Sequence, residues 1–168
     1  MKEGELLHKN NLCGMSIDEV FERYYTAVYR LAFARTKNRF DAEDVLQTVF
    51  LKLMKTDTCF TEPEHIKAWL IKVAVNTSKN LLTSAWNRLT EGIRDDYSID
   101  EQKTFEVYSE VLKLPEKYRT VVHLFYYEGY SCAEIAAILE TNESTVKTRL
   151  KRARERLETA LKGEDFGV

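Results

Sequence analysis

A chain of 168 residues has room for one ordinary domain or two small ones. Hydrophobic residues make up 44% of it and charged residues 31%, a balance that supports a packed core and excludes a wholly disordered chain. The 6 glycines and 2 prolines are too few for a collagen-like or turn-dense all-β chain, and they favour helices. The net charge of −2 differs from that of a typical constitutive nucleic-acid binder, which is basic.

The sequence contains no apolar run near the roughly 20 residues that span a bilayer. Its acidic opening, Met1–Glu5, is followed by no apolar block and so is unlike a signal peptide. The cysteines Cys13, Cys59 and Cys132 are far apart and form no CxxC pair, which argues against a disulfide framework or a zinc site. We therefore expect a reduced, cytoplasmic protein with no metal and no cofactor.

The first helix is predicted over 17–36. Residues 1–15 show no period and are expected to be a loose segment. Ser16 and Glu19 have the spacing of a capping box, in which each residue caps the other's backbone at a helix start. Apolar residues then recur at helical spacing at Val20, Phe21, Tyr24, Val28, Leu31 and Ala32.

Two more helices are predicted before residue 90. Asp41 is the next plausible N-cap, for a helix over 42–55, and 56–62 is expected to be a loop. Pro63 suits the first turn of a helix that runs to about Arg88. Its apolar stripe is predicted at Ile66, Leu70, Val73, Thr77 and Leu81. Its opposite, cationic and amide-rich face is predicted at Lys72, Asn76, Lys79, Thr83 and Trp86.

An acidic stretch over 88–104 lacks a sustained period and is interpreted as a linker. Helices are expected to resume near Phe105. A further helix is predicted from Pro115 to about Glu128, and it stops at Gly129, the residue type favoured just past a helix end.

The last third predicts a helix-turn-helix. Ser131 and Glu134 form a second capping box for a short helix, and Thr141–Asn142 supplies the turn and the next cap. Small residues are expected where the short helix packs, at Ala133, Ala136 and Ala137, beside inward-facing Ile135 and Leu139. The inner stripe of the last helix is predicted at Val146, Leu150, Ala153 and Leu157.

The first turns of that last helix carry polar side chains long enough to reach base edges in a major groove. They are Ser144, Thr145, Lys147, Thr148, Lys151 and Arg152. From the residues alone, a solvated basic helix in an ordinary bundle remains an alternative. The cationic face of 63–88 could likewise hold phosphates or be merely solvated. The acids that open 42–55 could bind a partner or only favour the helix dipole.

An enzyme is not indicated. The sequence has no Gly-rich phosphate loop, no GxSxG and no HExxH, and its three histidines are scattered. We therefore predict no catalytic residues.

Three motifs, in this order and at this spacing, resemble bacterial RNA polymerase sigma factors. Residues 41–53 (DAEDVLQTVFLKL) resemble the segment that binds core polymerase, and 68–80 (AWLIKVAVNTSKN) resemble the segment that melts and reads the minus-ten element. Residues 114–119 (LPEKYR), followed by 134–136 and 144–154, resemble the region that reads the minus-thirty-five element. The short length is similar to that of the extracytoplasmic-function (ECF) group.

The resemblance implies an all-α fold of two small helical domains joined by a flexible acidic linker. The domains would be a region 2-like unit over 16–88 and a region 4-like helix-turn-helix unit over 105–162, with 89–104 as the linker and 163–168 as a tail. It implies transcription initiation at a stress or envelope regulon as the function, and no catalysis. The implied partners are core RNA polymerase (the clamp coiled coil of its large subunit), promoter DNA and an anti-sigma factor.

The resemblance also assigns residues to these partners. For core polymerase they are Asp41, Asp44, Gln47 and Phe50. For minus-ten DNA they are Lys72, Asn76, Lys79 and Asn80, with the loop over 58–65 helping to hold a flipped base. For minus-thirty-five DNA they are Arg119, as a phosphate contact, and Ser144, Thr145, Lys147, Thr148, Lys151 and Arg152.

Two other functions remain to be distinguished. A stand-alone helix-turn-helix regulator would bind duplex DNA without polymerase, commonly as a dimer, but would not need the segments at 41–53 and 68–80. A helical adaptor or decoy would bind polymerase or a regulator without DNA. The sequence does not name the promoter, the inducing signal or a redox role for Cys59 or Cys132.

Overall fold

A computed structural model describes residues 11–86 and 102–164 of the chain. The chain divides into two compact units, Met1–Glu91 and Gly92–Val168. The first contains α1 (Ile17–Thr36), α2 (Arg39–Lys55) and α3 (Pro63–Trp86). The second contains α4 (Gln102–Lys113), α5 (Glu116–Val122), the π-helix η1 (His123–Tyr127), α6 (Cys132–Ile138) and α7 (Glu143–Glu164). The predicted all-α fold is confirmed, and no strand occurs within the described ranges.

The predicted loose segment, linker and tail fall mainly on 1–10, 87–101 and 165–168, which lie outside the described residues. The proposed domain boundaries therefore stay predictions. In the part of the chain that the structure describes, no helix is both long and apolar enough to cross a membrane.

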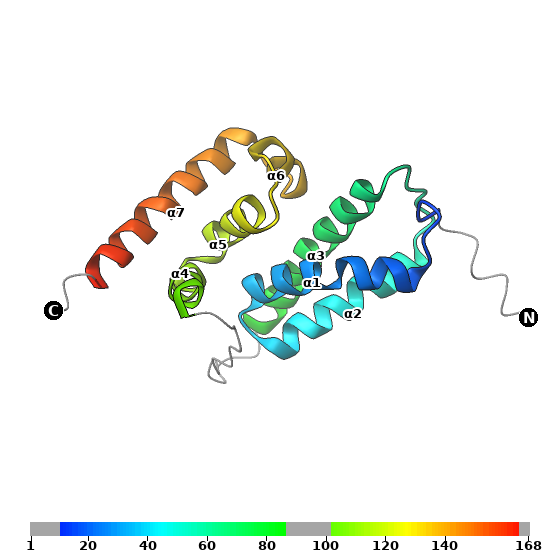
Figure 1. The fold of residues 1–168 in the computed structure, drawn as a ribbon, viewed down its shortest axis with the longest axis horizontal. Coiled ribbons are helices and arrows are strands. Elements are labelled where there is room, and N and C mark those ends of the chain that lie inside the picture. Colours follow the sequence, from blue (N-terminus) through cyan, green and yellow to red (C-terminus); the bar gives the residue numbers. More distant parts are fainter. Residues whose placement is uncertain (1–10, 87–101, 165–168) are drawn as a thin grey trace, which may run out of the picture. The chain divides into compact units, whose positions relative to one another are not determined.

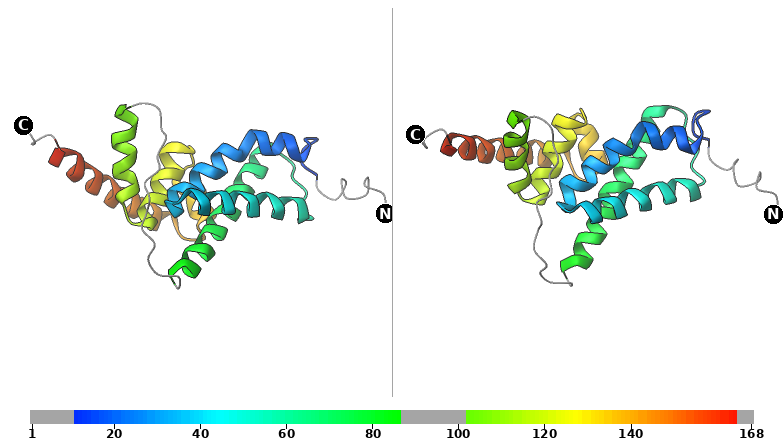
Figure 2. Two further views of the ribbon diagram at one scale, coloured as in Figure 1. Left: turned by 90° about the horizontal axis from the view of Figure 1, so that it is seen from below. Right: turned by 60° about the horizontal axis from the view of Figure 1, so that its bottom comes forward.

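The first unit is a three-helix bundle in which each helix packs on the other two (Figures 1 and 2). The predicted start of α1 is confirmed: the Glu19 N–H donates to Ser16 Oγ at 3.2 Å, and the Ser16 N–H donates to the Glu19 carboxylate at 2.7 Å. The core side chains come from one face of each helix. They include Val20, Val28 and Leu31 of α1, Val45, Val49 and Leu53 of α2, and Ile66, Leu70 and Ile71 of α3.

The start of α2 corrects one prediction. Its N-cap is Asn38, whose side chain accepts the Asp41 N–H at 3.1 Å, so Asp41 lies inside the first turn. Asparagine and aspartate are almost equally good N-caps, which is why the sequence did not choose between them. The choice follows from α1, which ends at Lys37 in a left-handed conformation (φ 56°) and leaves only a short connection.

The buried face of α3 is rotated from the predicted one. Ile66 and Leu70 are buried as expected, but the face continues through Ile71, Ala74, Val75 and Ser78. Val73, Thr77 and Leu81 are only half-buried. This helix has several rows of apolar residues, and the predicted stripe is only one of them. Because α3 packs against both α1 and α2, a wider face of it is buried.

The loop before α3 is fixed by the segment before α1. Leu12 and Phe60 form a parallel β-bridge, and the Phe60 N–H donates to Asn11 O at 2.9 Å. The Cys13 thiol lies 3.3 Å from Phe60 O, and the Phe60 ring packs edge-on against Trp69. The expected loop over 56–62 is confirmed, and Phe60, buried at 4% exposure, anchors its middle.

In the second unit, the predicted helix over 115–128 is divided. Pro115 is the N-cap of α5 rather than its first residue, and the last turns form a π-helix in which the Glu128 N–H donates to His123 O. A π-turn needs one extra residue per turn, which apolar periodicity does not reveal. Gly129 has φ 74°, the left-handed conformation expected at a helix end.

The predicted helix-turn-helix is confirmed, and the packing of several of its side chains is corrected. Ser131 and Glu134 form the capping box of α6, and the Asn142 side chain accepts the Thr145 N–H at 2.7 Å at the start of α7. The buried side chains are Ile135, Ala136, Ile138, Val146, Leu150 and Ala153. Ala133 and Ala137 are exposed, so close packing does not account for them, and Leu139 and Leu157 are half-buried.

These separate cores lead to a stability prediction. Leu31 is fully buried in the first unit and Leu150 is 2% exposed in the second. Replacing a buried leucine by alanine costs about 2–5 kcal/mol, from lost transfer free energy and the cavity left behind. We expect Leu31→Ala to accelerate amide hydrogen exchange across α1–α3 only, and Leu150→Ala across α5–α7 only. Equal acceleration in both units by either variant would contradict independent cores.

Candidate protein- and nucleic-acid-binding surfaces

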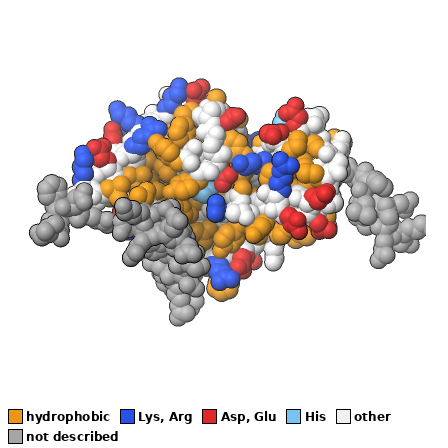
Figure 3. Space-filling view, in the orientation of Figure 1, with side chains coloured by type: hydrophobic (Ala, Val, Ile, Leu, Met, Phe, Trp, Pro, Cys, Tyr) orange, Lys and Arg blue, Asp and Glu red, His pale blue; other side chains and the backbone are white. Residues whose placement is uncertain are grey.

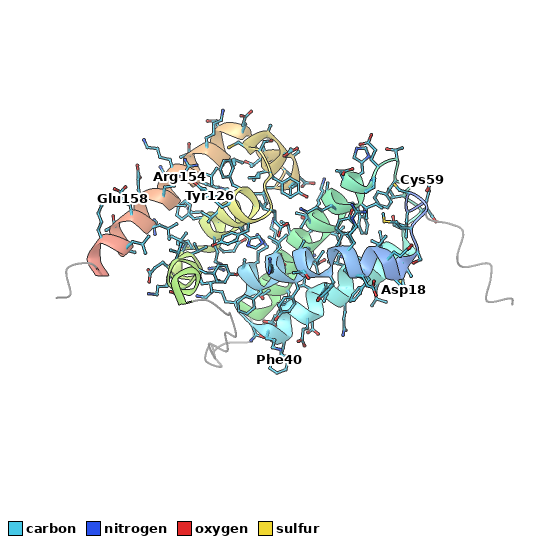
Figure 4. All side chains as sticks on the ribbon, viewed as in Figure 1. Asp18, Phe40, Cys59, Tyr126, Arg154 and Glu158 are labelled. Atoms are coloured by element: carbon cyan, nitrogen blue, oxygen red, sulfur yellow. The ribbon has the colours of Figure 1, made fainter. Side chains whose placement is uncertain are left out.

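The outer face of α2 carries large apolar side chains in water. Phe40, Leu51 and Met54 are 76%, 53% and 57% exposed, and Figure 4 shows Phe40 projecting away from the bundle. Asp44 and Gln47 are also exposed, and their spacing places them between these apolar residues on the same helix face. We call this set, Phe40, Asp44, Gln47, Leu51 and Met54, the α2 strip.

The α2 strip agrees with only part of the predicted polymerase contact. Asp44 and Gln47 belong to it, and Asp41 is half-buried at its edge. Phe50 does not belong to it: it is 6% exposed, and its ring packs edge-on against Phe21 of α1 at 4.8 Å. Phe50 is therefore a core residue in this structure.

Leu51 and Met54 were missed because apolar residues are ordinarily assigned to a core. The signal that could have identified them is spacing. Val45, Val49 and Leu53 already fill one face of α2, so apolar residues at 40, 51 and 54 must lie on another.

The polar face of α3 is confirmed. Asn76, Lys79, Asn80 and Thr83 are exposed, and Lys72 is half-buried. They lie opposite the buried row of this helix, so α3 presents a continuous cationic and amide-bearing surface. The side chain of Trp86, expected at the end of this face, lies outside the described side chains.

The predicted base-holding loop over 58–65 connects the end of α2 to the start of α3. Its first end follows α2, whose Lys52 Nζ donates to Thr77 Oγ1 at 3.4 Å. The other end begins α3, where His65 Nδ1 lies 3.0 Å from Thr61 Oγ1. At 1.5 Å per residue, His65 is about 16 Å from Asn76 along the helix axis. His65 and Asn76 therefore do not share one small pocket.

On α7, the predicted DNA-reading residues lie at the solvent side of the helix start. Ser144, Lys147, Thr148, Lys151 and Arg152 are exposed, and Thr145 is half-buried. Figure 3 shows Lys and Arg side chains along the outer side of this helix.

Lys147 is held by its own helix: its ammonium lies 2.8 Å from the Glu143 carboxylate. The hydrogen bond to Glu143 raises the pKa of Lys147, so this side chain stays cationic at neutral pH.

Further along α7, arginines occupy opposite flanks. Arg154 Nε donates to Tyr126 Oη at 2.6 Å, and its guanidinium lies over the Phe125 and Tyr126 rings; Figure 4 shows Arg154 beside Tyr126. On the other flank, the Arg156 guanidinium lies 5.0 Å from the centroid of the Tyr118 ring. Aromatic rings thus hold the two cations apart.

Arg119 does not fit its predicted role as a phosphate contact. It is 6% exposed, and its Nη1 donates to Leu114 O at 2.7 Å and to Leu112 O at 3.4 Å. These carbonyls belong to the end of α4 and the turn that follows it. In this structure Arg119 ties α4 to α5 rather than presenting its guanidinium to solvent.

Family models match both units. The model for sigma-70 region 2 matches residues 20–88, and the model for sigma-70 region 4 matches residues 104–157. RNA polymerase sigma factor SigV of Bacillus subtilis is 35% identical over 148 residues, covering 82% of this chain and 86% of that protein. The chain belongs to the sigma-70 family. Its relatives place it in the ECF group: ECF RNA polymerase sigma factor SigM of Mycobacterium tuberculosis is 29% identical over 158 residues, covering 91% of this chain and 81% of that protein.

Solved structures agree with the fold of this sigma factor. The sigma factor RpoE of Bartonella quintana, in complex with the anti-sigma factor NepR, matches with a TM-score of 0.70 and 24% identity over 86% of this chain and 96% of that one. CnrH, in complex with the cytosolic domain of CnrY, matches with a TM-score of 0.64 and 23% identity, covering 88% of each chain.

The family assignment decides between the functions that the sequence left open. A stand-alone helix-turn-helix regulator needs only the second unit, whereas the region 2 model covers all three helices of the first. The chain is a regulatory sigma factor, and the family is not one of enzymes.

The role of Arg119 gives a second stability prediction. Arg119→Ala leaves the carbonyls of Leu114 and Leu112 without this buried donor, which costs about 1–3 kcal/mol. We expect the midpoint of urea unfolding of the second unit, followed by hydrogen exchange in α5–α7, to fall. Full stability combined with weaker DNA binding would instead support the phosphate role.

Proposed function

We propose that this sigma factor binds core RNA polymerase through the α2 strip and promoter DNA through the polar face of α3 and the start of α7. The observation that carries the proposal is the exposure of Phe40, Leu51 and Met54 beside Asp44 and Gln47. A row of large apolar side chains in water is typical of a protein-binding surface. Residues 41–53 resemble the core-binding segment of sigma factors, and this resemblance implies that the partner is the clamp coiled coil of the large polymerase subunit.

The α3 face supports contact with minus-ten DNA. Lysines at 72 and 79 can neutralise phosphates, and the amides of Asn76 and Asn80 can pair with the edge of an unstacked base. Extruding a base from the stack costs a few kcal/mol of free energy, and contacts in a shaped polar pocket must offset this cost. We propose that Asn76 and Asn80, both exposed on this face, form part of that pocket.

The start of α7 supports contact with minus-thirty-five DNA. An α-helix fits a major groove with its first turns against the base edges. The exposed side chains there, Ser144, Lys147, Thr148 and Lys151, can donate to bases, and Thr148 offers a methyl group as well. Thr145 is half-buried, and its backbone N–H donates to the Asn142 side chain that caps the helix, so Thr145 belongs to the fixed helix start.

The near-neutral charge of the chain supports dependence on polymerase. Non-specific DNA affinity grows with the number of phosphates that a protein neutralises, and the 25 basic residues of this chain are offset by 27 acidic ones. Polymerase that holds both units on one promoter raises the effective concentration of the second contact. RpoE of Bartonella quintana, which has this fold, forms a complex with the anti-sigma factor NepR, and we propose such a partner and a stress or envelope regulon for this chain.

Core polymerase binding is tested by changing the polar members of the α2 strip. The double variant Asp44→Lys, Gln47→Ala should weaken binding of the full chain to bacterial core polymerase at least tenfold, because a lysine reverses the charge at the centre of the strip. Binding is measured by fluorescence anisotropy of labelled chain. The matched control, Glu22→Lys with Thr26→Ala, makes the same changes on exposed positions of α1 and should bind like the wild type. Equal binding by all three chains would contradict this assignment.

Minus-thirty-five reading is tested at Lys147. Lys147→Ala should reduce discrimination between a native and a mutated minus-thirty-five element by about 1–3 kcal/mol, the amount that one good bidentate contact supplies. The measurement is binding of the polymerase complex to both promoters, with core polymerase affinity measured in parallel. A parallel loss of polymerase affinity would show that Lys147 has a different role.

A further inference from the structure

An open cleft of roughly 490 Å³ lies between α5 and the second half of α7, and Arg152 is the one lining residue that was also assigned to base reading. It is lined by Tyr118, Arg152, Glu155, Arg156 and Thr159. Tyr118 comes from α5, and the other four come from two turns of α7. Nothing in the proposed function uses Tyr118 or Arg156.

The cations of this cleft are held in place by one ring. The Arg156 guanidinium and the Lys117 ammonium each lie 5.0 Å from the centroid of the Tyr118 ring. A hydrogen bond from Arg152 to the phenol, with the nearby charges of Lys117 and Arg156, lowers the pKa of Tyr118. Tyr118 itself is only 4% exposed, so the ring is a fixed platform.

A platform of this kind prepares arginines to bind an anion. A guanidinium has five N–H donors in a planar fork, and stacking on a ring leaves its edge free to donate. Because the ring restricts the arginine beforehand, less side-chain entropy is lost when an anion binds. Glu155 is the one acid among the five lining residues, so the cleft with Lys117 remains net positive.

The position of the cleft on α7 indicates which anion is within reach. Thr148 is among the residues proposed to meet base edges, and Arg152 and Arg156 follow it by four and eight residues. At 1.5 Å per residue they lie about 6 and 12 Å further back along the helix axis. A recognition helix lies in the major groove with its first turns on base edges, and the backbone phosphates line both sides of that groove. Cations one and two turns behind the base-reading turns are therefore placed to reach a backbone phosphate.

We propose that the Tyr118–Arg152–Arg156 cleft binds a backbone phosphate of the promoter beside the minus-thirty-five element. The proposal rests on the proposed function of α7 and assigns Arg152 to the phosphate rather than to a base. Such a contact positions α7 in the groove and carries no sequence information.

The test compares two arginines of one helix. Arg156→Ala should weaken binding of the polymerase complex to promoter DNA equally for a native and a mutated minus-thirty-five element. The slope of log affinity against log salt should become shallower by about 0.9, the amount expected for one phosphate contact in B-DNA. Arg154→Ala removes the same charge from the opposite flank, where Arg154 is bonded to Tyr126, and should leave the slope unchanged. Arg156→Lys should restore part of the slope.

Tyr118→Phe provides a second test, because it keeps the ring and removes only the oxygen that Arg152 uses. It should weaken promoter binding less than Arg156→Ala and in the same sequence-independent way. Circular dichroism of each variant verifies folding.

The outcomes separate this inference from the proposed function. If wild-type complexes select the promoter but Arg156→Ala keeps the wild-type salt slope, or matches Arg154→Ala, the phosphate cleft is wrong and the proposed function stands. If Arg156→Ala weakens core polymerase binding instead, the cleft is a protein-binding surface and the inference fails. If the wild-type complex does not select a promoter at all, the proposed function fails and the inference with it.

Discussion

A bundle of three helices can bury only one face of each helix, and this limit governs how the first unit presents its surfaces. Val45, Val49 and Leu53 occupy the buried face of α2, which forces Phe40, Leu51 and Met54 into water. The same geometry on α3 turns Asn76 and Lys79 outward opposite the buried row. A bundle of three helices therefore displays two chemically different surfaces, one with exposed apolar side chains and one with exposed cations and amides, because the core takes up the other faces.

In the second unit, α7 likewise buries only one face. The inner row of α7 is filled by Val146, Leu150 and Ala153, and its outer side is free for DNA. The flanks are then distinguished by their aromatic neighbours. Arg154 pairs with Tyr126 on one flank, and Arg156 stacks on Tyr118 on the other. Ring contacts thus give cations of equal charge different surroundings on one helix.

Local signals in the sequence predicted most of this structure. Both capping boxes, the Gly129 helix end and the inner row of α7 follow from interactions between residues a few positions apart, and the structure confirms them. Features that involve a second helix were not predicted. Asn38 rather than Asp41 caps α2, and Arg119 bonds to the end of α4. Each of these depends on a preceding or neighbouring helix, which periodicity within one segment cannot register. The π-helix was missed for a related reason, since its extra residue changes the backbone bonding without removing the apolar pattern.

The β-bridge between Leu12 and Phe60 has a consequence for where this protein can be shortened. The α-helical boundaries alone suggest that a fragment of the first unit could begin at Ser16, where the first capping box lies. Such a fragment would retain all three helices but lose the backbone partner of Phe60 and the thiol beside its carbonyl. The loop into α3 would then keep the Phe60 ring against Trp69 and the Tyr24 hydroxyl that donates to Pro63 O at 3.1 Å. The smallest faithful fragment of this unit therefore begins at residue 11, ahead of its first helix.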